Sequence, residues 1–187
     1  MKTEAGLTIS REHTPPWPHG LAEIMEFYGN PDRNGDMIRD PVWDQEFITT
    51  VKLPYPMRRS WPDAEGKYPT VTHVKVHRRC AWALIAALEE FAHEVGEDTI
   101  HAQGWDVWGG CDNWRPQTGG KVLLSIHSWA AGVDVNPALG EYGKPSRQPE
   151  ELLEAFRKLG ATCGADWPAM NPAWPCDAMH IQFASGY

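Results

Sequence analysis

The chain has 187 residues and a net charge of −8 at pH 7, with a pI near 5.4. The length suits one domain with a complete core, and the acidic charge argues against nucleic acid as a partner, because phosphate binding needs clustered lysine and arginine. No apolar stretch approaches the roughly 20 residues of a membrane span, and residues 1–18 lack the apolar core of a secretory signal, so we expect cytoplasmic synthesis and no membrane span.

The predicted elements of the first hundred residues follow from hydrophobic periodicity and from turn residues. In chain order they are a helix over 21–27, a strand over 47–53, a turn-rich loop over 54–69 and a strand over 73–77. Apolar residues then recur at helical spacing from Leu84 to Val95, and Gly96 is suited to end that helix. This is predicted to be the main core helix, whereas residues 1–70 are predicted to be an irregular N-terminal part.

In the second half, a helix is predicted over 149–159, with Pro149 suited to its first turn and Gly160 to its end. Strands are predicted near Ile100, Leu123, Val133 and Ile181. These elements predict an α+β domain with a small, mostly antiparallel sheet and helices packed on one face. We expect a monomer whose single domain spans residues 1–187, with its functional residues in 100–187.

A short apolar segment in this second half carries the first candidate functional side chain. If it is a strand, alternate side chains face opposite sides, so Val122, Leu124 and Ile126 would face the core. Ser125 and His127 would then share the opposite, polar face.

Two further polar side chains lie within apolar segments. Asp134 stands between two valines, where a carboxylate costs several kcal/mol unless a charged or hydrogen-bonding partner compensates it. His180 and Gln182 share one face of the last predicted strand. Gly132 suits a tight bend or a close backbone approach that brings His127 towards Asp134.

Two imidazoles and one carboxylate are the ligand set of a zinc hydrolase that keeps one position open for water. His127, Asp134 and His180 are therefore candidate Zn²⁺ ligands, and Asp177 is a nearby candidate proton acceptor. The alternatives are a buried, hydrogen-bonded histidine and a capping aspartate. Cys176, next to Asp177, is a candidate soft ligand.

Two separated motifs resemble the signatures of one family. His127-Ser-Trp-Ala-Ala-Gly-Val-Asp-Val-Asn-Pro137 resembles the pattern His-Ser-Trp-Gly-x-Ala-x-Asp-x-Asn-Pro, and Asp177-Ala-Met-His-Ile-Gln182 resembles Asp-Pro-Met-His-Phe-Glu or Gln. These patterns are typical of the zinc D-Ala-D-Ala carboxypeptidase and L-alanyl-D-glutamate endopeptidase family. Its members cut peptidoglycan stem peptides and include many phage endolysins.

The resemblance implies a role for each matched residue. His127, Asp134 and His180 would bind Zn²⁺, and Asp177 would be the catalytic base. Arg115 falls where the family keeps an arginine that binds substrate and stabilises the oxyanion; its alternative is a surface ion pair. The implied fold is the Hedgehog/DD-peptidase fold.

The match has departures between the ligands. Ala130 replaces the family's glycine, Ala131-Gly132 replaces a bulkier residue followed by alanine, and Ala178 replaces proline. All ligands stay in register, so these changes affect the shape of the loops. Gly164-Ala-Asp-Trp167 resembles the family's Gly-Gly-Asp-Trp segment.

Other residues with chemical potential have simpler interpretations. Most of the ten tryptophans are expected in the core or in pocket walls, but Trp129 is predicted at the lip of the site, where it and Ser125 would contact substrate. His73 and His77 lack a third ligand and are interpreted as surface or hydrogen-bonded residues. Cysteines without Cys-x-x-Cys spacing are expected to be free in a reducing cytoplasm: Cys80, Cys111, Cys163 and Cys176.

The resemblance thus implies a zinc-dependent peptidase that hydrolyses amide bonds in peptidoglycan stem peptides or cross-links. A phage or prophage endolysin, acting on the cell wall after release, is the expected form. The alternative is a non-catalytic cell-wall-binding or structural module that retains the fold.

Overall fold

The computed structural model describes residues 16–117 and 123–187. Within them, six strands form one sheet in the order β2-β1-β3-β4-β6-β5. The strands are β1 (Ile48–Arg59), β2 (Thr70–His77), β3 (Val107–Gly110), β4 (Gly132–Val135), β5 (Thr162–Cys163) and β6 (His180–Gln182). β1 and β3 pair in parallel, and the other neighbouring strands pair antiparallel. The sheet is therefore mixed, which corrects the mostly antiparallel sheet expected from the sequence.

The parallel pair arises from the path of the chain between β1 and β3. That path runs through β2 and two helices, which is long enough to return the chain to the same end of the sheet. The helices are α1 (Gly20–Tyr28), α2 (Pro41–Phe47), α3 (Ala81–Val95), α4 (Glu97–Gln103), α5 (Glu150–Arg157) and α6 (Trp167–Met170). The α+β class is confirmed. No helix among the described residues is long and apolar enough to cross a membrane.

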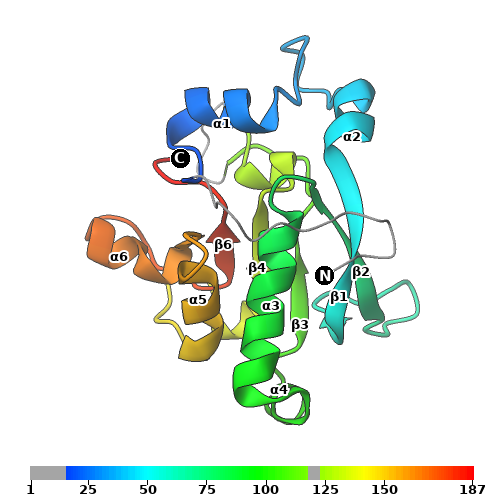
Figure 1. Cartoon of the computed structure of the whole chain (residues 1–187), viewed down its shortest axis with the longest axis vertical. Coiled ribbons are helices and arrows are strands. Elements are labelled where there is room, and N and C mark those ends of the chain that lie inside the picture. Colours follow the sequence, from blue (N-terminus) through cyan, green and yellow to red (C-terminus); the bar gives the residue numbers. More distant parts are fainter. Residues whose placement is uncertain (1–15, 118–122) are drawn as a thin grey trace.

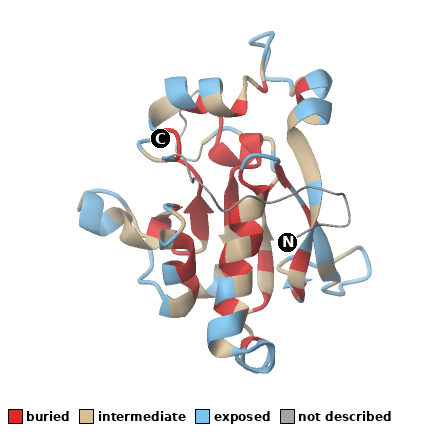
Figure 2. Ribbon diagram, in the orientation of Figure 1, coloured by how far each residue is buried: buried red, intermediate tan, exposed pale blue. Residues whose placement is uncertain are grey.

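Three of these helices confirm predictions from periodicity. α1, α3 and α5 lie where helices were expected, and Gly96 ends α3 with a φ of 84°. α3 and α5 pack against each other across one face of the sheet, whereas α1 and α2 lie near one end of it (Figure 1). Buried residues concentrate in the strands and on the sheet-facing sides of α3 and α5 (Figure 2).

Other expectations were wrong for local reasons. Ile100 is the buried residue of helix α4 rather than part of a strand, and two acidic residues in the first turn favour that helix. Residues 54–59, expected to be a loop, continue β1 with Leu53, Tyr55 and Met57 buried in alternation. The intervening prolines fall at a register shift in the pairing with β2. The part expected to be irregular, 1–70, contains α1, α2 and β1 from residue 16 onwards.

His77, the last residue of β2, is completely buried. Its ring stacks on Phe47 with centroids 5.3 Å apart and meets Tyr28 edge-on. Nε2 donates to the Tyr28 carbonyl at 3.1 Å, and Nδ1 accepts from the Arg79 backbone N–H at 3.2 Å. This confirms a hydrogen-bonded, neutral histidine, whereas His73 is exposed. Burial lowers the pKa of His77 to about 3.

His77 should make the stability of the protein depend on pH. The folded-state pKa lies below the ordinary value of 6.5, so the unfolded state binds more protons between pH 6.5 and 3. The free energy of unfolding is expected to fall as the pH drops through that window, by at most about 1.4 kcal/mol per pH unit from this group, and to be insensitive to it above pH 6.5. Urea unfolding at a series of pH values measures the slope.

The variant His77→Gln should be less stable at pH 7 but should show a shallower slope below pH 6.5. The exposed His73 on the same strand provides the control, and His73→Gln should keep the original slope. Identical slopes in the two variants would contradict the assignment.

Candidate metal centre

His127 lies in a short 3-10 helix, η1 (Ile126–Trp129), and not in the strand that was expected. The Ser125 hydroxyl caps this turn by accepting from the His127 backbone N–H at 3.4 Å, and Ala130 ends it with a φ of 49°. Ser125 is buried together with Leu124 and Ile126, so the predicted alternation of faces is wrong. Val122 lies outside the described residues. The cap provided by Ser125 thus favours a helical turn at residues whose alternating hydrophobic pattern predicted a strand.

Asp134 and His180 are opposite each other on the antiparallel pair β4 and β6. Val133 and Val135 are fully buried on the core side of β4, so Asp134 projects from the other side of the sheet. Gly132 allows a close approach of His180, because a Cβ there would lie 3.1 Å from Cε1 of that ring. The sheet therefore fixes two of the candidate ligands relative to each other.

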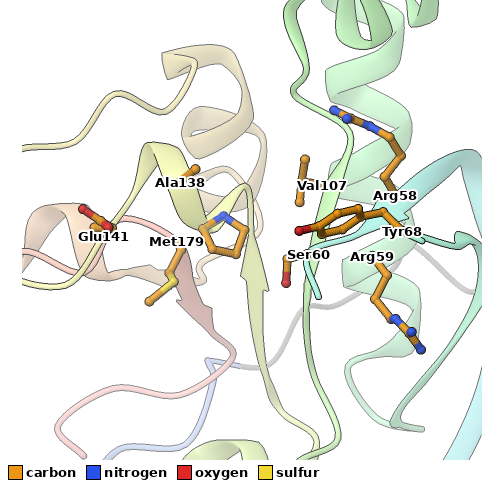
Figure 3. A pocket seen from close by; sticks show the side chains of 9 residues that line it. Arg58, Arg59, Ser60, Tyr68, Val107, Ala138, Glu141 and Met179 are labelled. Carbon is orange, nitrogen blue, oxygen red and sulfur yellow. The ribbon is translucent and has the colours of Figure 1, made fainter. Parts of the chain in front are cut away.

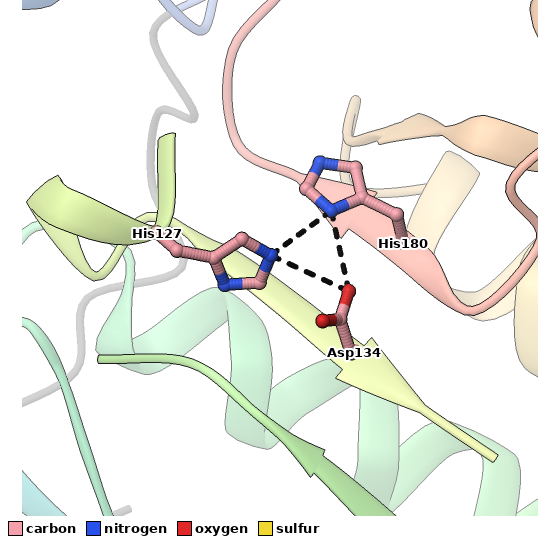
Figure 4. A group of neighbouring side chains, drawn as sticks. All are labelled: His127, Asp134 and His180. Atoms are coloured by element: carbon pink, nitrogen blue, oxygen red, sulfur yellow. Dashed lines mark hydrogen bonds and ion pairs between the residues drawn. The ribbon is translucent and has the colours of Figure 1, made fainter. Parts of the chain in front are cut away.

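The three candidate ligands meet at one point, as Figure 4 shows. Nε2 of His127 is 3.1 Å from Nδ1 of His180 and 3.4 Å from Oδ1 of Asp134, and the last two atoms are 3.3 Å apart. With bonds near 2.1 Å, donor atoms around a tetrahedral Zn²⁺ are separated by about 3.4 Å. The spacing of the donor atoms thus fits such an ion.

Hydrogen bonds on the far side of each ring fix the proton positions. Nδ1 of His127 donates to the Cys111 carbonyl at 3.0 Å. Nε2 of His180 donates to Oε1 of Gln182 at 3.0 Å, and the amide nitrogen of that glutamine donates to the Ala184 carbonyl. In their neutral forms both histidines therefore direct a lone pair towards Asp134, and three acceptors face one another. This arrangement suits a cation.

The close contact of these three side chains shifts the pKa values of Asp134 and His180. Burial alone would raise the pKa of Asp134, but hydrogen bonds and charge from the two histidines outweigh it and hold that pKa well below its usual range. Burial would lower the pKa of His180, whereas Asp134 raises it, and the net effect is a raised pKa. The carboxylate is therefore ionised at neutral pH and available as a metal ligand.

Asp177 lies just before β6, next to the three ligands but outside the group they form. Its Oδ1 is buried and has no hydrogen-bond partner among the described residues. Burial raises the pKa of Asp177 to about 6, with Asp134 adding to the rise, while both histidines and Arg115 oppose it. The site thus holds a second carboxyl group whose pKa is close to neutrality.

The segment Gly164–Trp167 positions Asp177. The Asp177 backbone N–H donates to the Gly164 carbonyl at 3.0 Å, and a Cβ on Gly164 would overlap the Asp177 carbonyl oxygen. The Trp167 ring lies 5.5 Å from the His180 ring. In the sequence, this segment is recognisable only by its resemblance to the family motif, which predicted no role for it.

Arg115 is attached to η1 through its backbone. Its N–H donates to Oγ of Ser128 at 3.1 Å, and its carbonyl accepts from the Ser125 N–H at 2.9 Å. The guanidinium makes no ion pair with a carboxylate among the described residues. The alternative interpretation of Arg115, a surface ion pair, is therefore not supported by these residues. Its charge is close enough to lower the pKa of Asp177.

The expected position of Trp129 was wrong. Trp129 is 2% exposed, donates from Nε1 to the Gly29 carbonyl at 2.8 Å and packs edge-on against Tyr187, so it belongs to the core rather than the lip. The cysteines are free, as predicted, and Cys176 is not part of the ligand group. Sequence analysis missed the Cys111 carbonyl and the role of Gln182, although Gln182 had been placed on the same strand face as His180.

Comparison with known families agrees with the two motifs. Residues 118–183, roughly a third of the chain, match a peptidase family model described as D-alanyl-D-alanine carboxypeptidase, which confirms the resemblance found in the sequence. The matched segment contains the three candidate ligands and Asp177, whereas Arg115 lies just outside it. The match supports a peptidase that acts on peptidoglycan, and peptidases of this family depend on zinc. Neither the curated proteins nor the solved structures contain a match to the chain.

Gln182 should control metal affinity without being a ligand. The variant Gln182→Leu removes the acceptor that orients His180, and loss of such an outer hydrogen bond typically lowers metal affinity about 10- to 100-fold. A competition titration with a chromophoric zinc chelator at pH 7.5 measures the change. Gln103→Leu, at the exposed end of α4, should leave the affinity unchanged. An affinity equal to that of the unaltered protein would show that Gln182 does not orient the ligand.

Proposed function

We propose that the protein is a zinc-dependent peptidase that hydrolyses amide bonds in peptidoglycan stem peptides or cross-links, built on the Hedgehog/DD-peptidase fold. The observation that carries this proposal is the convergence of His127, Asp134 and His180 beside Asp177, whose Oδ1 is buried without a hydrogen-bond partner among the described residues. The family match over 118–183 supports the same substrate class. A role in lysis as a phage or prophage endolysin is part of the proposal and rests on the resemblance of the two motifs alone.

The three ligands would hold Zn²⁺, which when bound acts as a Lewis acid towards a carbonyl oxygen and lowers the pKa of water. Asp177 would accept a proton from the attacking water and deliver it to the leaving amine. Burial raises the pKa of Asp177, which suits both steps, because a carboxylate with a raised pKa is a better proton acceptor and its conjugate acid can still protonate an amine. Arg115 would stabilise the negative charge that develops on the carbonyl oxygen.

A binding-only module is less consistent with this site. Such a module has no use for a carboxyl oxygen that is buried without a partner, as Oδ1 of Asp177 is, because burying an unpaired polar atom costs free energy. Retaining Asp177 beside a full ligand set is explained by a catalytic role.

Separate variants should distinguish the proton acceptor from the ligands. Asp177→Ala is expected to retain zinc and to lower the hydrolysis rate about a hundred- to ten-thousand-fold, because it removes the general base. His180→Ala is expected to lose both zinc and activity. Zinc content by atomic emission and rates on purified cell-wall fragments measure the two effects.

The control for this pair is Asp98→Ala in the first turn of α4, which should alter neither quantity. Equal loss of zinc from the Asp177 and His180 variants would mean that Asp177 is a ligand and that its proposed role is wrong.

The zinc-loaded protein should release new amino termini from purified bacterial sacculi, and mass spectrometry of the fragments should identify the bond that is cut. Chelation should abolish the release, and added Zn²⁺ should restore it. Protein carrying stoichiometric zinc that releases no amino termini from cell walls of differing stem-peptide and cross-bridge chemistry would refute the proposed activity.

A further inference from the structure

A cavity of about 470 Å³ lies between the end of β1 and the segment that follows β4. Val107 lines it from β3, Tyr68 and the arginines Arg58 and Arg59 from one side, and Met179 from the other (Figure 3). Its volume is within the range of about 300–1,000 Å³ that is usual for small-ligand sites. The proposed function assigns no role to this cavity.

The cavity is adjacent to the metal centre on the same side of the sheet. Trp108 is buried on the core side of β3, so its neighbours Val107 and Gly109 face the side that carries Asp134. A Cβ on Gly109 would lie 2.8 Å from Cβ of Asp134 and 2.7 Å from Cγ of Pro137, which lines the cavity. Glycine at this position therefore lets the candidate ligand Asp134 and the cavity-lining Pro137 both pack directly against β3.

A second connection runs through β6. Met179 lines the cavity, and the next residue is the ligand His180. The Met179 backbone is held on both sides, because its carbonyl accepts from the Val135 N–H at 2.9 Å and its N–H donates to the Gly140 carbonyl at 3.1 Å. A cavity-lining residue and a candidate ligand therefore follow each other on one segment whose backbone is held in place.

The two arginines at the cavity differ in their partners. Arg58 is neutralised by Asp106, whose Oδ1 lies 3.0 Å from Nη2 of the arginine. Arg59 makes no ion pair within the described residues; its Nε donates to the Trp61 carbonyl at 3.0 Å, and its guanidinium lies 5.1 Å from the Trp61 ring centroid. Its terminal N–H groups are therefore available to a ligand, and Trp61 limits the positions that the guanidinium can adopt.

The other groups define the rest of the ligand. Figure 3 shows the Tyr68 ring beside Val107, with its hydroxyl directed towards the side formed by Ala138 and Met179, and with the two arginines on either side of the ring. Across the cavity, Glu141 forms an ion pair with Lys144, so its charge is compensated. A ligand would complement these side chains if its apolar part contacted Val107 and Tyr68 and its anionic group bound Arg59.

We infer that this cavity is a substrate subsite for an acidic peptide, in which Arg59 binds a carboxylate of the substrate and Tyr68 covers its aliphatic part. The inference rests on the proposed function for the identity of the polymer, since stem peptides bear free carboxylates. The two residues that it assigns to substrate recognition, Arg59 and Tyr68, lie outside the metal centre and outside the segment 118–183 matched by the family model.

Calorimetric titration of the zinc-loaded protein with two matched peptides tests the inference without requiring turnover. One peptide is γ-D-glutamyl-L-lysine amide, which has a free α-carboxylate on glutamate; in the other, D-isoglutaminyl-L-lysine amide, a carboxamide replaces that carboxylate. A charge-assisted hydrogen bond to Arg59 should make the acidic peptide bind at least about tenfold tighter, and added salt should reduce the difference.

The variant Arg59→Gln should abolish the preference for the acidic peptide, and Tyr68→Ala should weaken binding of both peptides. Arg78→Gln is the matched control, because the Arg78 guanidinium also lies 5.1 Å from an aromatic centroid, that of Phe47, but does not line the cavity. This control should keep the preference, as should Tyr142→Ala, whose side chain is 56% exposed against 59% for Tyr68.

Equal affinity for the two peptides in the unaltered protein would overturn the subsite, as would a preference that survives Arg59→Gln. These outcomes are separable from failure of the proposed function. Hydrolysis of sacculi without any preference between the peptides would refute the subsite alone, whereas an Arg59-dependent preference in a protein that hydrolyses no cell wall would refute the peptidase activity and leave the subsite established.

Discussion

The site depends on three lone pairs held within 3.4 Å of one another inside a largely buried pocket of the sheet. His127 and His180 cannot turn away, because the other nitrogen of each ring is engaged by an acceptor. Asp134 cannot turn away either, because the β4 ladder places it opposite His180. Without a cation, the group must share a proton, which is reflected in the raised pKa of His180 and the lowered pKa of Asp134. A divalent ion removes that conflict.

Backbone contacts at two glycines hold the segment that carries Asp177 and His180. A Cβ on Gly164 would overlap the Asp177 carbonyl, and a Cβ on Gly140 would overlap the Met179 backbone. The chain therefore passes between two loops that approach it as closely as backbone allows. This packing places Asp177 beside the ligands while leaving its Oδ1 without a protein partner, so the position of the carboxyl group is determined by backbone packing rather than by hydrogen bonds of its own.

Sequence reasoning succeeded where the signal was local or chemical. The periodicity of α3 and its glycine stop are contained within sixteen residues. The three candidate ligands, chosen by residue type and order, lie together even though the strand expected at His127 was wrong. It was wrong where a competing local interaction prevailed: the Ser125 cap turned the strand expected at His127 into a 3-10 helix, and a register shift let β1 continue through two prolines. The Cys111 carbonyl could not be predicted, since a backbone acceptor has no signature in the sequence.

The charge distribution gives the metal centre and the cavity a common electrostatic character. The chain carries a net charge of −8, yet Arg115 near Asp177 and Arg59 at the cavity both lack an ion-pair partner among the described residues. The neighbouring carboxylates are compensated, Asp106 by Arg58 and Asp134 by the two histidines. Two of the unpaired positive charges on this acidic protein thus lie beside the candidate metal centre and the cavity. In the proposed peptidase these two charges would attract anionic peptides and disfavour cationic ones, so they would select substrates by charge before the candidate ligands or Asp177 contact them.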